Sequence, residues 1–162
     1  MIMIIDASSI IAFYSENELN EPDLLHTLSQ NNRSLIIPVA VYKEIRKGGK
    51  PTVSILSKAI EDNTIQVCSD ITPEETELFR KRHPRLHDGE LQVLLLGLKM
   101  KANGTPYCCV IDEGPARSIA KRIGLNVKGT KGLIFLLNQI GVVDKSKMER
   151  LLYTLEHCNF RL

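Results

Sequence analysis

Short apolar runs alternate with helix-length segments along the whole of this 162-residue chain, and this alternation limits the folds that it can adopt. Runs of this length, rich in Ile, Val and Leu, are typical of buried strands. Strands that alternate with helices predict an α/β fold, a three-layer sandwich with a central, mostly parallel sheet and helices on both faces. The predicted strands cover residues 2–5, 34–37, 65–67, 107–111 and 125–127.

The segments between these runs carry the signals that begin and end helices. Pro22 suits the first turn of a helix. Thr72 and Glu75 have the spacing of a helix cap and its partner in the first turn. Asn103 and Gly104 end the longest apolar helix. The predicted helices begin near Ser8 and after Thr72, and cover residues 21–31, 39–46, 52–61, 87–102, 115–123, 131–140 and 146–156.

The length and composition of the chain fit one globular domain, expected to cover residues 1–162. No apolar run approaches the roughly 20 residues that span a bilayer, and no basic segment opens the chain, so a cytoplasmic protein without a membrane anchor is expected. The four cysteines lack C-x-x-C spacing, which favours buried, reduced thiols over a zinc site. The predicted C-terminal helix, within residues 145–162, is expected to pack on the domain or on a partner.

An acidic residue directly follows two of the predicted strands. Asp6 comes after Ile5, and Asp112 comes after Ile111. Taken singly, each could be a helix cap or a turn residue, a role that Asp often fills. The carboxyl ends of parallel strands lie at one edge of the sheet, where ligands of such folds bind. Two strands with the same ending therefore favour a site in which both carboxylates meet.

Three further acids lie on or at the start of predicted helices. Glu44 is in the short helix after the second strand, where it could simply be an exposed residue. Asp88 and Glu90 flank Gly89 at the start of the longest apolar helix. Asp88 could cap that helix, and Glu90 could complement its dipole. Glu90 is the stronger site candidate because it leads directly into an apolar stretch that must face the interior.

Several carboxylates in one cleft repel one another and raise each other's pKa unless a cation joins them. Their hard oxygen ligands suit Mg²⁺ or Mn²⁺. One or two such ions can hydrolyse a phosphodiester, because one activates a water and another stabilises the leaving oxygen. The acids therefore indicate metal-dependent hydrolysis of a phosphodiester.

Other chemistries have less support in the sequence. It contains no G-x-x-x-x-G-K-[ST] loop and no G-x-G-x-x-G after the first strand, so nucleoside triphosphates and NAD are not indicated. No G-x-S-x-G elbow marks a serine hydrolase. A phosphatase with a phosphoaspartate is a rival because Asp6 ends the first strand. However, Ser8 stands where phosphatases of the haloacid dehalogenase type have a second Asp.

Five stretches of the sequence together match one known family. Each alone is weakly specific, but their order and spacing are specific. The stretches are Ile4–Ile10, Ile36–Ile45, Leu86–Leu91, Val110–Ala120 and Gly129–Leu133. On these stretches, within residues 2–142, the chain resembles PIN-domain proteins, in particular their VapC-like prokaryotic group. The resemblance implies a PIN-like fold.

The resemblance assigns the family's acids to this sequence one at a time. Asp6 matches the first acid, Glu44 the second and Asp112 the last. The third is ambiguous, because Glu90 fits the Gly-Glu form of the subgroup while Asp88 could share or take over its role. We therefore expect Asp6, Glu44, Glu90 and Asp112 to be both catalytic and metal-binding.

The resemblance also assigns supporting residues. Ser8 fits a position that commonly hydrogen-bonds the acidic cluster, and Glu113 stands where some relatives have a second acid. Thr130 and Arg117 match motifs of the subgroup. The candidates for holding an RNA backbone at the rim of the site are Lys43, Arg46 and Arg117.

The implied activity is that of an endoribonuclease dependent on Mg²⁺ or Mn²⁺. Many relatives are toxins held in check by a small antitoxin, and many dimerise, so an antitoxin partner and a homodimer are expected. The alternative is a catalytically silent PIN-like module that binds RNA or a protein without cutting. The formal net charge of +2 is too small to decide between them, whereas the complete acid set favours the enzyme.

Overall fold

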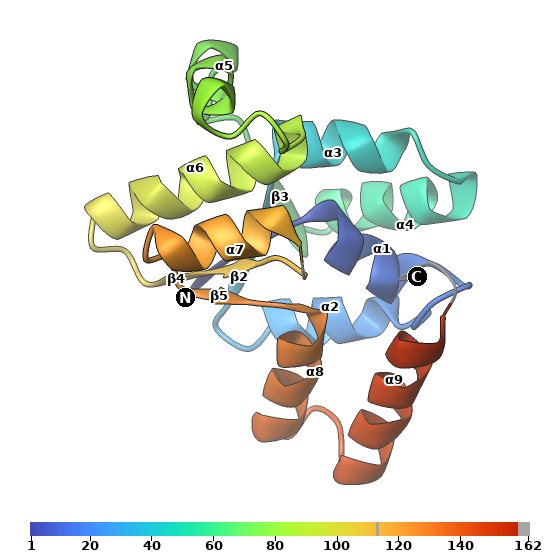
Figure 1. Ribbon diagram of the computed structural model, residues 1–162. Coiled ribbons are helices and arrows are strands. Elements are labelled where there is room, and N and C mark those ends of the chain that lie inside the picture. Colours follow the sequence, from blue (N-terminus) through green and yellow to red (C-terminus); the bar gives the residue numbers. More distant parts are fainter. Residues whose placement is uncertain (113, 159–162) are drawn as a thin grey trace.

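One parallel sheet organises the structure, a computed structural model in which residues 1–112 and 114–158 are described. The strand order is β3-β2-β1-β4-β5, and every pairing among the described residues is parallel (Figure 1). The expected α/β fold is therefore confirmed, with a sheet that is wholly rather than mostly parallel. The strands are β1 (Ile2–Ile5), β2 (Ser34–Pro38), β3 (Ile65–Cys68), β4 (Tyr107–Val110) and β5 (Val127–Lys128).

Helices cover both faces of this sheet, which gives the expected three layers. Figure 1 shows α3, α6 and α7 over one face and α2 over the other, while α8 and α9 pack together beside the sheet. The helices are α1 (Ala7–Tyr14), α2 (Pro22–Ser29), α3 (Val39–Arg46), α4 (Lys50–Glu61), α5 (Pro73–Arg82), α6 (Asp88–Ala102), α7 (Pro115–Arg122), α8 (Thr130–Gln139) and α9 (Lys145–His157). Within the described ranges, none of them is long and apolar enough to cross a membrane.

The two innermost apolar runs form the centre of the core. Met3, Ile4 and Ile5 of β1 are completely buried, and all of β4 is buried beside them. Strands covered by helices on both faces read as continuous apolar runs rather than alternating ones, which is why these two were readable from the sequence. The four cysteines are free thiols as expected, but Cys68 is only half-buried because it ends the edge strand β3.

Several predicted boundaries shift by one to three residues for local reasons. Helix α1 begins at Ala7 rather than Ser8 because the Asp6 side chain caps it. Helix α4 begins at Lys50 rather than Thr52, because Gly49 is its cap and a proline occupies the first turn. The helix start at Thr72 has both hydrogen bonds of the predicted capping box. Edge strand β5 lies two residues later than expected, where it pairs with β4.

The register of the central strands brings the ends of β1 and β4 together. Ile5 pairs with Val110, and the Asp6 amide then donates to the Val110 carbonyl at 3.0 Å. Asp6 and Asp112 therefore leave neighbouring strands at the same edge of the sheet. This edge is where an open α/β sheet binds its ligands.

Candidate active site

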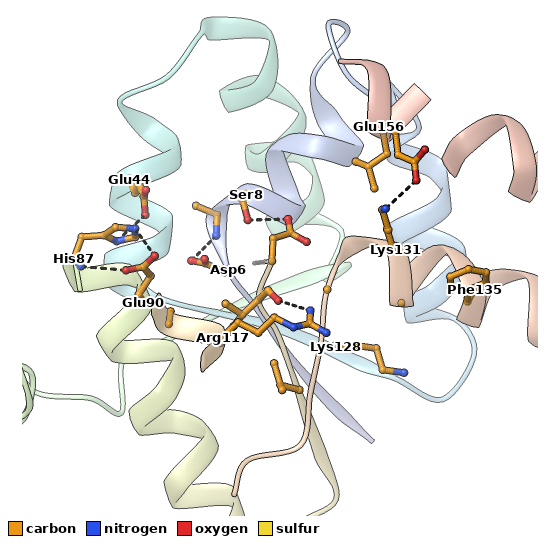
Figure 2. A pocket seen from close by; sticks show the side chains of 18 residues that line it. Asp6, Ser8, Glu44, His87, Glu90, Arg117, Lys128, Lys131, Phe135 and Glu156 are labelled. Carbon is orange, nitrogen blue, oxygen red and sulfur yellow. Dashed lines mark hydrogen bonds and ion pairs between the residues drawn. The ribbon is translucent and has the colours of Figure 1, made fainter. Parts of the chain in front are cut away.

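A cavity of about 740 Å³ opens at this carboxyl edge of the sheet (Figure 2). Asp6, Glu44, Glu90 and Asp112, the four acids expected in the site, all line it. They come from the ends of β1 and β4 and from helices α3 and α6, so residues up to 106 positions apart in the sequence meet here. The remaining lining residues are Ala7, Ser8, His87, Ile111, Ala116, Arg117, Val127, Lys128, Gly129, Lys131, Gly132, Phe135, Leu155 and Glu156.

Asp6 is the most deeply buried of the four acids, with 6% of its surface exposed. Its carboxylate accepts a hydrogen bond of 2.9 Å from the Ala7 amide and so caps α1. Burial is the main cause that raises the pKa of Asp6 to about 7, and the negative charges of Glu90 and Glu44 contribute to this rise. Asp6 is thus both the cap of α1 and a buried carboxylate close to other acids. Its role as a cap therefore does not exclude a place among the acids of the cavity.

Glu44 and Glu90 face each other from different helices and share one histidine. The His87 ring lies 3.2 Å from Glu90 and 3.8 Å from Glu44, and Figure 2 shows it between the two carboxylates. The hydrogen bond to Glu90 is the main cause that raises the His87 pKa to about 9, and the charges of Glu90, Glu44 and Asp6 add to it. A protonated imidazole therefore compensates part of the negative charge on this side of the cavity at neutral pH. The sequence reasoning missed His87, although its place just before Asp88 could have drawn attention to it.

Gly89 permits the close approach of α3 to the first turn of α6. A Cβ atom at Gly89 would lie 2.8 Å from a carboxylate oxygen of Glu44 and 3.3 Å from Val41. Real Cβ atoms essentially never approach another atom as closely as the first of these distances. The Gly-Glu pair therefore has a physical reason here, because the glycine makes room for the acid of a neighbouring helix.

Replacing Gly89 with Ala is expected to separate metal affinity from stability. Glu44 would have to swing away and buried Val41 would have to shift slightly, a cost that the gain of up to about 1 kcal/mol in helix propensity offsets. We expect a melting temperature in EDTA close to that of the wild type and a Mn²⁺ affinity lower by about tenfold or more, as for other residues that orient ligands. Paramagnetic resonance of free Mn²⁺ measures the affinity, with Glu44→Gln as the comparison. An unchanged affinity in Gly89→Ala would show that the position of Glu44 does not matter.

Asp112 is held on the opposite side of the cavity by the start of α8. Its carboxylate accepts hydrogen bonds from the Thr130 amide at 2.7 Å and the Thr130 hydroxyl at 2.9 Å. Ser8 donates a third, at 3.2 Å. A Cβ at Gly129 would lie 3.0 Å from Asp112, so this glycine also makes room for an acid. Two of the residues expected to support the acids, Ser8 and Thr130, both contact Asp112.

The other predicted residues fall into three groups. Asp88 does not line the cavity, because its side chain forms an ion pair with Arg80. Arg117 lines it and donates to the Ile111 carbonyl at 3.0 Å. Lys43 and Arg46 are exposed but outside the cavity lining, and Glu113 lies outside the described residues.

The chemistry of the donor set fits a hard divalent cation. All four acids offer carboxylate oxygens, and a cation would compensate the buried charge and the repulsion that together raise the Asp6 pKa. Over residues 1–112 and 114–158, however, no three side chains of His, Cys, Asp or Glu are close enough together to hold a metal. The acids are engaged elsewhere, with His87 on one side and Thr130 on the other. Metal binding would therefore require Glu44 and Glu90 to leave His87 and the carboxylates to draw closer together. Thr130 would still orient Asp112.

Fold and site together define an α/β protein with a carboxylate-lined cavity at the carboxyl edge of a parallel sheet. The chain belongs to the PIN-domain family, which it matches over residues 2–162. The family that the sequence resembles is therefore confirmed, and PIN domains are generally nucleases.

One solved structure illustrates the shared fold. A chain in the crystal structure of VapBC2 from Rickettsia felis, bound to a DNA fragment from their promoter, is similar with a TM-score of 0.50 and 15% sequence identity. The similarity covers 80% of the present chain and 98% of that chain, and at this identity it concerns the fold alone. No curated protein matches the sequence.

Proposed function

We propose that the protein is an endoribonuclease that depends on Mg²⁺ or Mn²⁺. The observation that carries the proposal is the convergence of Asp6, Glu44, Glu90 and Asp112, from four separate elements, on one cavity of a PIN domain. The individual caps and hydrogen bonds of these acids do not explain why all four meet in one cavity, because clustered carboxylates cost stability unless a cation or another partner compensates them. Of the two candidates for the third acid, we propose Glu90, because Asp88 points to Arg80 instead.

The four acids would hold the metal, which when bound supplies an activated water and stabilises charge on the phosphate. The Thr130 amide and hydroxyl orient Asp112, and Gly89 lets Glu44 reach the cavity. The Arg117 guanidinium lines the cavity and would bind a substrate phosphate. In the metal-free protein, protonated His87 compensates part of the negative charge of Glu44 and Glu90. The cavity would therefore have an acidic region for hydrolysis, with the Arg117 cation beside it for binding the substrate.

Metal binding is expected to stabilise the folded protein. A ligand that binds only the folded state at ten times its Kd adds about 1.4 kcal/mol, which corresponds to a rise of a few °C in Tm for a chain of this length. Melting curves with 1–10 mM Mn²⁺ or Mg²⁺, compared with EDTA, measure the shift. A Glu44→Gln, Glu90→Gln variant serves as the control and should show no shift.

Cleavage of a labelled RNA in Mg²⁺, with EDTA as the control, tests the activity itself. Turnover of a small phosphoester without cleavage of RNA would indicate the rival phosphatase. The catalytically silent module is the second candidate, because three metal-binding side chains are not preassembled anywhere in the described residues. If metal causes no thermal shift and RNA is not cleaved, this second function replaces the first.

We also propose that a small antitoxin protein binds and inhibits this chain, and that the chain forms a homodimer. The support is the similarity of its fold to a chain of VapBC2, which was solved with promoter DNA. A short adjacent reading frame would identify the partner, and co-expression should then abolish RNA cleavage. Light scattering on the purified chain measures whether it dimerises.

A further inference from the structure

The cavity has a second end with a chemistry that the four acids do not use. Lys128 from the end of β5 and Lys131 and Phe135 from α8 line this end (Figure 2). Lys131 and Phe135 are four residues apart on one helix and therefore lie on the same face. An acidic region and a region of cations with an aromatic ring thus share one cavity.

Phe135 differs from the other apolar residues of α8. Leu133, Ile134 and Leu137 of this helix are fully buried, whereas Phe135 is 52% exposed. Single exposed apolar side chains are common on protein surfaces and need no explanation by themselves. This ring is distinctive because it lines the cavity next to positive charge, where an unfilled apolar surface is available to a ligand.

The two lysines at this end are not equivalent. Lys131 forms an ion pair of 2.9 Å with Glu156 of α9, which compensates its charge. Lys128 is half-buried and forms no ion pair with any residue of the described chain. Gly132 allows Lys128 to lie close to α8, because a Cβ at Gly132 would be only 2.9 Å from the Lys128 Cβ. A half-buried cation without an ion pair among the described residues and an exposed ring therefore line the same end of the cavity.

We propose that Phe135 stacks on a base of single-stranded RNA and that Lys128 binds a phosphate of the same strand. The inference rests on the proposed function, because the RNA strand held at this end would continue to the four acids at the other end of the same cavity. A ring for the bases and a cation for the backbone are the two elements with which proteins hold single strands, and stacking tolerates any base. Double-stranded RNA keeps its bases stacked internally and cannot use the ring.

Binding of two fluorescent oligomers in EDTA tests the proposal without cleavage. One is an eight-residue oligouridylate, and the other is an abasic ribose-phosphate chain of equal length. Phe135→Ala should weaken binding of the oligouridylate about fivefold or more, the lower end of what loss of a stacking side chain costs, and leave the abasic chain unchanged. Phe135→Trp should restore binding. Lys128→Ala should weaken both oligomers and lower the slope of log Kd against log salt by about 0.7.

Tyr153→Ala is the matched control, because Tyr153 is 65% exposed on the neighbouring helix α9 but does not line the cavity. It should bind both oligomers like the wild type. Equal effects of Phe135→Ala on the two oligomers, or none, would overturn the stacking role. A change in molar mass of Phe135→Ala by light scattering would assign the ring to a protein interface instead. If the wild type cleaves RNA but Phe135→Ala binds the oligouridylate as tightly as the wild type, only this inference is refuted. If the wild type does not cleave RNA but its binding depends on Phe135, only the nuclease activity is refuted.

Discussion

Asp6→Asn is expected to remove RNA cleavage while making the metal-free protein more stable. Asp6 lies between the two sides of the cavity and is the acid with the least exposure to solvent. An amide keeps the shape of the side chain but takes away the charge that a cation requires. The loss of cleavage should exceed the roughly 10–100-fold that follows from removing a group that only orients a ligand.

The stability of Asp6→Asn follows from the raised pKa of the wild-type carboxyl group. Because the pKa of Asp6 is about 7 in the folded protein and 3.8 in a solvated reference, the folded state binds this proton more tightly. The stability that this bound proton contributes is therefore fully present below about pH 4 and is lost as the pH rises to about 7. In EDTA at pH 8, the unfolding free energy of Asp6→Asn should exceed that of the wild type by on the order of a few kcal/mol. Its melting temperature should therefore be higher. The two proteins should differ little at pH 4.

Asp88→Asn is the control for this substitution, because Asp88 is an exposed acid outside the cavity. It should retain cleavage, whereas Glu90→Gln should lose it. Loss in Asp88→Asn with retention in Glu90→Gln would instead make Asp88 the third acid. Unchanged cleavage in Asp6→Asn would rule out a catalytic role for the four-acid site.

The positions of Asp6 and Asp112 could be predicted because topology alone decides them. Each follows an apolar run, and the ends of neighbouring parallel strands must meet at one edge of the sheet. Glu44 and Glu90 needed the family resemblance, because their meeting depends on how closely α3 packs against α6. Gly89 leaves room for Glu44 at this contact, and this effect is visible only in three dimensions.

His87 and Phe135 could not be assigned from the sequence for a related reason. A histidine before a helix, or an aromatic residue in an apolar stretch such as 133–137, has an ordinary role in most proteins. Only tertiary packing places His87 between two carboxylates and leaves Phe135 exposed in a cavity. Conversely, the basic residues Lys43 and Arg46 looked suitable in sequence, but the turn of α3 that carries them leaves both outside the cavity.

Thr130→Val is expected to lower cleavage by about 10–100-fold through the position of Asp112. Thr130 is completely buried, and its hydroxyl contacts both Asp112 at 2.9 Å and Ser9 at 2.8 Å. Valine keeps the shape and the amide that donates to Asp112, but removes this hydroxyl. Loss of a buried hydrogen-bond partner should also cost about 1–3 kcal/mol of stability. Thr130→Ser keeps the hydroxyl and should retain most of the cleavage activity.

Ser9→Ala separates the effect on Asp112 from the effect on the fold. It removes the same buried hydrogen bond to Thr130 but leaves the Thr130 hydroxyl available to Asp112. We therefore expect a comparable loss of Tm in both variants, but a large loss of RNA cleavage and of Mn²⁺ affinity only in Thr130→Val. Assays well below both melting temperatures measure this difference. Equal losses of cleavage would mean that a loosened α1–α8 contact, rather than the orientation of one carboxylate, limits the reaction.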